Sequence, residues 1–158
     1  MKTIRNFVTI CALTLLFSAC TDNDDSLVDN SAQIQELVNT FNSGSWRITN
    51  FNDSGQDETG DFQGYNFTFS SNGTVVATNG TETINGTWSV TDSSNSSSSS
   101  SSSEDDIDFN LFFQVPTTHN FDDLNDDWDV VSVSPTVVSL IDVSGGNGGT
   151  DRLTFTKN

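Results

Sequence analysis

The sequence is poor in basic residues, which excludes several classes of function. Its 158 residues include five lysines and arginines against 22 aspartates and glutamates, for a formal net charge of −17. Proteins that bind DNA or RNA neutralise phosphates with clustered lysine and arginine, and the sequence has no such cluster. A polybasic patch for acidic lipids is excluded for the same reason. We therefore expect no nucleic-acid partner.

Histidine is equally scarce, which leaves little for catalysis. His119 is the single histidine, so a Ser-His-Asp triad would have to use it. No nucleophile-elbow sequence surrounds any serine, and the carboxylates occur in runs rather than as isolated pairs on apolar faces. We predict that the protein is not an enzyme and needs no cofactor, with His119 an exposed loop residue.

The N-terminal segment is predicted to be a signal peptide. Two basic residues precede an apolar run over residues 7–17, which is too short for a permanent membrane span but suits a secretory signal. Residues 18–20, Ser-Ala-Cys, then resemble the lipobox of bacterial lipoproteins, in which the cysteine is lipidated and becomes the new N-terminus. The resemblance implies a signal peptide over residues 1–19 and a lipid anchor on Cys20. An ordinary cleaved signal is the alternative.

The residues after Cys20 are acidic and predict a location at the cell surface. Residues 21–25, Thr-Asp-Asn-Asp-Asp, resemble the export signal that places lipoproteins of the Bacteroidota on the outer leaflet of the outer membrane. We expect an acidic tether over residues 20–30 and a protein held at the membrane by its lipid. The alternative is a tether that only keeps the domain off the membrane. Ser26 lies in a triplet that looks like the O-glycosylation motif of that phylum, so it is a candidate for glycosylation.

Residues 31–158 are predicted to form one domain that begins with a helix. Ile34, Leu37, Val38 and Phe41 follow the i, i+3, i+4, i+7 spacing of an amphipathic helix. We expect about three helical turns, whose apolar stripe covers an end or a side of the sheet that follows.

From residue 45 onward, apolar and polar residues alternate as they do in half-buried strands. The alternation is plain in Tyr65, Phe67 and Phe69, and Asn72-Gly73 follows them as a tight hairpin turn. About eight short strands follow one another in this way, and most connections have the length of a hairpin.

Two connections are longer. Residues 92–106 contain an unbroken run of serines followed by three acidic residues, with nothing to bury, so we predict a disordered loop within one domain. The entropy cost of closing a loop grows only slowly with its length, so the domain tolerates the insertion. Residues 116–127 hold Phe121 and Leu124, which we expect to form a short helical turn over one end of the sheet.

Eight consecutive antiparallel strands leave two open edges unless the sheet closes on itself. We therefore predict an all-β fold, an eight-stranded antiparallel up-and-down β-barrel with one N-terminal amphipathic helix. Several short motifs in order resemble the lipocalin-like lipoproteins of the Bacteroidota: Trp46-Arg47-Ile48, Phe67-Thr68-Phe69, Asn72-Gly73-Thr74, Gly86-Thr87-Trp88 and Leu153-Thr154-Phe155. That resemblance covers residues 45–158 and implies a barrel that usually carries no known catalysis.

A barrel of eight strands is just wide enough to be filled by side chains or to hold one small ligand. Our leading hypothesis is a small hydrophobic or amphipathic ligand inside, with an arginine anchoring its acidic group. The predicted ligand-binding residues are Trp46, Arg47, Tyr65, Phe67, Phe69, Trp88, Phe109, Leu111 and Phe113. Arg47 could instead help to close the barrel end, and the aromatic residues could simply fill the core. The alternative function is a structural or adhesive surface module that contacts a protein or polysaccharide through its loops.

The acidic runs suggest weak candidates for a calcium site. Asp122, Asp123, Asp126 and Asp127 lie within six residues, and hard cations prefer such oxygen ligands. Their spacing is not that of an EF-hand loop, so a solvated acidic surface is the preferred interpretation. We also expect few carboxylates on the inward faces of the strands, and we expect the negative charge to keep the protein monomeric.

Overall fold

The computed structural model describes residues 30–92, 107–143 and 148–158. The predicted signal peptide, Cys20, Ser26 and all of the predicted tether before Asn30 lie outside the described residues. So does the predicted serine-rich loop beyond residue 92. Predictions on those segments therefore remain predictions.

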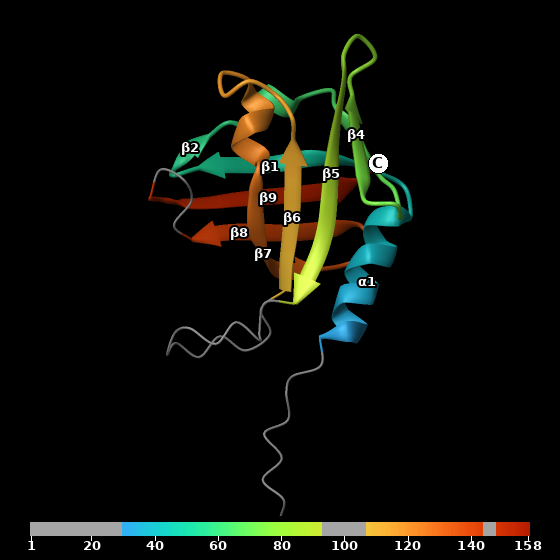
Figure 1. The fold of residues 1–158 in the computed structure, drawn as a ribbon. Coiled ribbons are helices and arrows are strands. Elements are labelled where there is room, and N and C mark those ends of the chain that lie inside the picture. Colours follow the sequence, from blue (N-terminus) through green and yellow to red (C-terminus); the bar gives the residue numbers. More distant parts are fainter. Residues whose placement is uncertain (1–29, 93–106, 144–147) are drawn as a thin grey trace, which may run out of the picture.

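The described chain contains one α-helix, nine strands and two short 3-10 helices, which are drawn in Figure 1. In chain order these are α1 (Ser31–Asn42), β1 (Ser45–Asp53), β2 (Gln56–Asp57), η1 (Thr59–Phe62), β3 (Asn66–Phe69), β4 (Thr74–Thr78), β5 (Thr83–Asp92), β6 (Ile107–Phe113), η2 (Asn120–Leu124), β7 (Asp126–Val133), β8 (Val137–Val143) and β9 (Thr150–Lys157). The predicted helix and the predicted helical turn at Phe121 and Leu124 are both confirmed.

Eight of the strands close into an antiparallel up-and-down barrel. From β3 to β9 each strand pairs with the next, and β1 pairs with both β3 and β9. β2 pairs only with the end of β1 and takes no part in the closure. Figure 1 shows β5 and β6 crossing in front of β1, β8 and β9, which belong to the opposite wall. The predicted all-β barrel is confirmed, and closure removes the sheet edges that would otherwise invite aggregation.

Irregular pairing in β1 and β7 bends these strands. The register between β1 and β9 shifts between Ile48 and Asn50, and that between β7 and β8 shifts between Val130 and Ser132. Each extra residue increases the local twist, which helps a sheet to close. In β1 the shift also explains why the buried positions run Ile48, Phe51 rather than continuing at every second residue.

Helix α1 packs its apolar face onto one end of the barrel. Leu37 and Phe41 are buried, while Ile34 and Val38 pack against the same core. The indole nitrogen of Trp46 donates a hydrogen bond to the Phe41 carbonyl oxygen at 3.1 Å, which ties the end of the helix to β1. No helix in the described ranges has the length and apolarity needed to cross a membrane.

Candidate functional site

The inward face of the barrel was the predicted ligand site. All but one of the predicted ligand-binding residues are buried there, and Tyr65, with 8% exposure, is the least buried. These residues are Trp46, Tyr65, Phe67, Phe69, Trp88, Phe109, Leu111 and Phe113. The alternation of period two thus identified the inward positions from the sequence alone.

Near α1, the centre of the barrel is occupied by Phe41. Its ring centroid lies 4.5 Å from that of Phe69, 4.6 Å from that of Phe109 and 5.1 Å from that of Trp46. Aromatic pairs prefer separations of this order. Phe41 itself has no exposed surface. A residue from the helix, outside the predicted site, therefore fills the space between the predicted ligand-binding residues.

The other end of the barrel is filled from η1 and η2. The ring of Phe121 lies 4.9 Å from those of Tyr65 and Phe113 and stacks on Phe67 at 5.8 Å. Phe62 packs on Phe121 at 5.4 Å. Aromatic side chains delivered from both ends thus pack together as one core, which is how a small barrel is filled when it holds no ligand.

Arg47 does not join the aromatic residues. It is exposed, and its guanidinium nitrogen Nη1 donates a hydrogen bond to the Asn158 Oδ1 at 3.0 Å. Along the β1–β9 pairing it lies opposite Thr156, whereas Arg152 lies opposite Asn52 near the far end of the strand. The two arginines therefore lie at different places along the pairing of β1 with β9. Arg47 faces solvent rather than the barrel interior.

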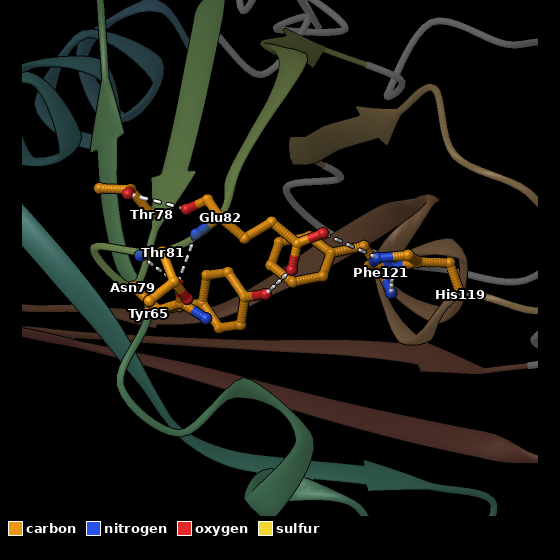
Figure 2. A network of polar contacts seen from close by, with 7 residues as sticks. All are labelled: Tyr65, Thr78, Asn79, Thr81, Glu82, His119 and Phe121. Atoms are coloured by element: carbon orange, nitrogen blue, oxygen red, sulfur yellow. Dashed lines mark hydrogen bonds and ion pairs between the residues drawn. The ribbon is translucent and has the colours of Figure 1, made fainter.

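A polar network lies at the η2 end of the barrel and joins Tyr65, Glu82 and His119 (Figure 2). The Tyr65 hydroxyl donates to the Glu82 Oε2 at 2.5 Å, and the Glu82 Oε1 lies 3.7 Å from the His119 Nε2. The His119 Nδ1 accepts a hydrogen bond from the Phe121 backbone N–H at 3.2 Å. With Nδ1 accepting, a neutral His119 carries its proton on Nε2, toward Glu82.

Local turn chemistry presents Glu82 to this network. Asn79 begins the turn after β4, and its Oδ1 accepts hydrogen bonds from the backbone N–H groups of Thr81 and Glu82 at 3.0 and 2.8 Å. Gly80 follows with φ of 88°, a conformation that favours glycine. Asn-Gly turns are recognisable in sequence, but the pairing of Glu82 with a tyrosine and a histidine from other loops is not.

Within the network the Tyr65 hydroxyl acts as a hydrogen-bond donor to Glu82. Burial, the hydrogen bond to Glu82 and the negative charge of Glu82 together raise the pKa of Tyr65 to about 12. Tyr65 therefore keeps its proton at neutral pH and acts as a donor, not as a base. A hollow of about 240 Å³ adjoins the network, lined also by Asp61, Thr118 and Asn120.

Three aspartates point inward at the same end of the barrel, where the sequence predicted few carboxylates. Asp151 is 9% exposed, and its Oδ1 accepts hydrogen bonds from the Ser54 backbone N–H at 2.8 Å and hydroxyl at 3.1 Å. Asp142 lies opposite Asp151 in the β8–β9 pairing, and its Oδ2 is buried without a hydrogen bond. Asp126 lies two residues before the buried Trp128. For Asp126 and Asp142, burial removes hydration that the charged carboxylate would need, which favours the protonated form.

The pKa values of Asp126 and Asp142 are both raised. Burial raises the pKa of Asp126 to about 6, with further contributions from its hydrogen bond to Asp127 and from the charge of Asp142. Burial and the charge of Asp151 also raise the pKa of Asp142. Hydrophobic periodicity does not reveal these two inward carboxyls, because it marks apolar positions only.

The weak calcium candidates are not gathered into a metal site. Asp126 faces inward, Asp127 is exposed, and Asp122 accepts a hydrogen bond from the Asn125 amide at 3.1 Å. Within the described residues, no group of three or more histidine, cysteine, aspartate or glutamate side chains is arranged to hold a metal ion. Their spacing in the sequence reflects the η2–β7 junction rather than a coordination shell.

Comparison with known proteins gives a likeness to a solved structure and no match in sequence. No protein-family model matches the chain, and no curated protein matches it. Among solved structures, the chain is similar to a DUF4847 family protein from Bacteroides vulgatus ATCC 8482, with 20% sequence identity and a TM-score of 0.48. The alignment covers 75% of this chain and 94% of that chain.

Proposed function

We propose that this protein is a lipid-anchored module of the outer membrane, displayed at the cell surface, that binds its partner on the outside of a filled barrel and catalyses no reaction. The supporting observation is the filled interior. Phe41 and Phe121 enter from opposite ends, are 0% and 1% exposed, and pack on the residues predicted to hold a ligand. Of the two functions suggested by the sequence, this favours the surface module over the internal carrier.

Energetics point the same way. Truncating a buried phenylalanine to alanine typically costs about 3–5 kcal/mol. An internal ligand would have to displace rings such as Phe41 and offset a loss of that order before gaining any affinity. The internal ligand therefore remains a prediction of lower rank, while the exposed face of the barrel is open to contact without rearrangement.

The proposed anchor and location rest on the N-terminal sequence. The lipobox-like residues 18–20 and the acidic residues 21–25 precede a folded part that begins at α1. The short stretch over residues 20–30 would serve as the tether between lipid and barrel. A closed eight-stranded barrel behind such a signal also agrees with the resemblance to lipocalin-like lipoproteins.

The location is tested on the full chain in its native host. Feeding an alkyne analogue of palmitate should label the wild-type protein and leave Cys20→Ala unlabelled. Antibody should bind the wild type on intact cells, and neutralising the aspartates at positions 22, 24 and 25 should reduce that binding while leaving the lipid label in place. A wild-type chain without label, or one reached only after lysis, overturns this part of the proposal.

The filled interior is tested by fluorescence on the chain that starts at Cys20. Trp46 and Trp88 line the interior, so fatty acids or sterol-like probes that enter the barrel should quench or shift their emission. We expect no saturable change with either probe class. A saturable change that disappears in Trp46→Phe would revive the internal carrier, because Trp46 is fully buried and, unlike Trp88, does not line the outer hollow beside β5 and β6.

A further inference from the structure

The outer wall formed by β4, β5 and β6 has almost no charge, although the chain is strongly acidic. Side chains that alternate with the buried ones on these strands face outward, and they are mostly hydroxyl or amide groups. They are Thr74, Val76, Thr78, Thr83, Asn85, Thr87, Ser89, Thr91, Asn110 and Phe112, and the row on β6 ends at Asp108. A neutral polar wall in a protein of net charge −17 is a local departure from its composition.

Phe112 stands on this wall with 54% of its surface exposed. It is the one exposed aromatic side chain among the described residues, since the other described phenylalanines, tryptophans and the tyrosine are buried. In the β5–β6 pairing it lies opposite Thr87, with Ser89 opposite Asn110 beside it. The barrel core does not need Phe112, because the inward positions of β6 are already taken by Phe109, Leu111 and Phe113.

A hollow of about 530 Å³ runs beside Phe112, and we refer to it as the β5–β6 groove. Thr87, Ser89, Asn110 and Phe112 line it from the outer face, together with Trp88, Leu111, Asn125 and Asp126. Its volume falls within the range of about 300–1,000 Å³ that is typical of small-molecule sites. Thr87 and Ser89 are exposed, so their hydroxyls can both donate and accept hydrogen bonds.

One rim of the groove is held rigidly by Asn125. Its Oδ1 accepts from the Phe113 backbone N–H at 2.6 Å, and its Nδ2 donates to the Phe113 carbonyl oxygen at 3.0 Å. The side chain thereby replaces a strand residue beside the end of β6. The backbone next to Phe112 is fixed by this pair of hydrogen bonds, which lowers the entropy cost of binding a ligand there.

We propose that the β5–β6 groove binds a neutral oligosaccharide. The apolar face of a sugar ring carries C–H groups with partial positive charge, which pack favourably on the negative face of the Phe112 ring. The sugar hydroxyls would exchange hydrogen bonds with Thr87, Ser89 and Asn110. The inference rests on the proposed function only in that the partner is met on the outside of the barrel.

Other ligand classes fit the groove less well. No lysine or arginine lines it, so an anionic ligand would meet only the acidic field of the protein. A lipid chain would leave the hydroxyl and amide groups unpaired, which costs free energy. A protein partner would usually need a larger contact, with an apolar centre, than one exposed aromatic ring supplies.

The experiment is a titration of the chain that starts at Cys20, followed by calorimetry and by amide shifts in NMR spectra. The probes are tetrasaccharides of cellulose, starch, laminarin, mannan and chitin, with tetragalacturonate as the anionic comparison. We expect at least one neutral probe to bind saturably and to shift the amides of β5 and β6, while tetragalacturonate does not bind.

Variants locate the binding. Phe112→Ala should weaken it about tenfold or more, which corresponds to about 1.4 kcal/mol, and Thr87→Val should weaken it several-fold while keeping the side-chain shape. Val143→Ala is the matched control, because Val143 is 59% exposed on β8 and outside the groove. Thermal unfolding of each variant confirms that it is folded.

Three results overturn the inference: no neutral probe binds, Phe112→Ala binds as the wild type does, or the uronate binds as well as the neutral sugars. If none of the sugars binds while the lipid label and the fluorescence result hold, the proposed function stands and only the sugar is wrong. If the palmitate analogue fails to label the protein while a sugar still binds, the proposed lipid anchor is wrong and the sugar-binding groove stands.

Discussion

The ring of Phe41 in α1 stacks on the ring of Phe109 in β6, with centroids 4.6 Å apart and 28° between their planes. Phe41 belongs to a helix and Phe109 to the middle of a barrel wall, so the contact places a helical side chain in the interior of the barrel. The helix therefore acts as an integral part of the core rather than as an appendage of the tether.

Phe41→Ala should lower the free energy of unfolding by about 3–5 kcal/mol, because it removes a fully buried ring and leaves a cavity. Urea denaturation followed by tryptophan fluorescence measures the loss. Asn39→Ala, on the exposed face of the same helix, should change stability by about 0.5 kcal/mol at most. A loss below about 1 kcal/mol for Phe41→Ala would show that the helix is not part of the core.

Gly86→Ala should also destabilise the barrel. A Cβ at position 86 would lie 2.5 Å from the Phe112 carbonyl oxygen and 2.6 Å from the Phe113 ring, so backbone and core must both shift. Overpacking of this kind typically costs about 1–3 kcal/mol. Gly60→Ala is the control, since nothing lies within 4 Å of its added Cβ. Equal melting temperatures for the two variants would contradict the close approach of β5 and β6.

The inward aspartates predict that stability falls as the pH rises. The folded state raises the pKa of Asp126 to about 6 from its ordinary value of 3.8, so between these values the folded protein binds more protons than the unfolded one. Stability therefore decreases from about pH 4 to about pH 6 and this contribution levels off above. Asp126→Asn should reduce the decrease, so the variant gains stability relative to wild type at pH 7 but not at pH 4.

The control for that experiment is Glu36→Gln, which removes one exposed acidic charge from α1. It should leave the slope between pH 4 and pH 6 unchanged. Urea unfolding at several pH values provides the measurement, and a wild-type slope that Asp126→Asn leaves intact would mean that other carboxyls govern this range.

Tyr65 is the single tyrosine of the chain, so its titration can be followed by ultraviolet absorbance without interference from another phenol. Glu82→Gln should lower its pKa from about 12, because the negative charge and the charged acceptor that favour the protonated phenol are both removed. Burial of the phenol is the first cause of the raised pKa of Tyr65 and persists in the variant. The pKa of Tyr65 should therefore stay above its ordinary value of 10.0. Glu58→Gln should have no effect, and an unchanged titration in Glu82→Gln would contradict the hydrogen bond seen in Figure 2.

The barrel could be predicted from sequence because its determinants are local. Tyr65, Phe67 and Phe69 alternate with polar residues, and a period of two places such residues on one face whatever lies beyond them. By the same rule Arg47, next to the inward Trp46, belongs outside, where the structure has it. Its inclusion among the ligand-binding residues gave its chemistry more weight than its position in the alternation.

The remaining features depend on contacts between distant parts of the chain. β2 has two residues and η1 has four, which is too short for a periodic pattern. The bulge in β1 adds a residue, and the sequence marks it only by a break in the apolar alternation between Ile48 and Phe51. The network of Tyr65, Glu82 and His119 joins three loops that only the closed barrel brings together. The spacing of these residues in the sequence therefore does not predict it.

The seam between β1 and β9 also sets the order in which the protein can fold. Residues 46–52 pair with residues 152–157, so the first strand of the barrel has no partner along most of its length until the last strand has been synthesised. Structures dominated by such distant pairings fold slowly. The barrel of a nascent chain therefore cannot close during translation until the C-terminal strand β9 has left the ribosome.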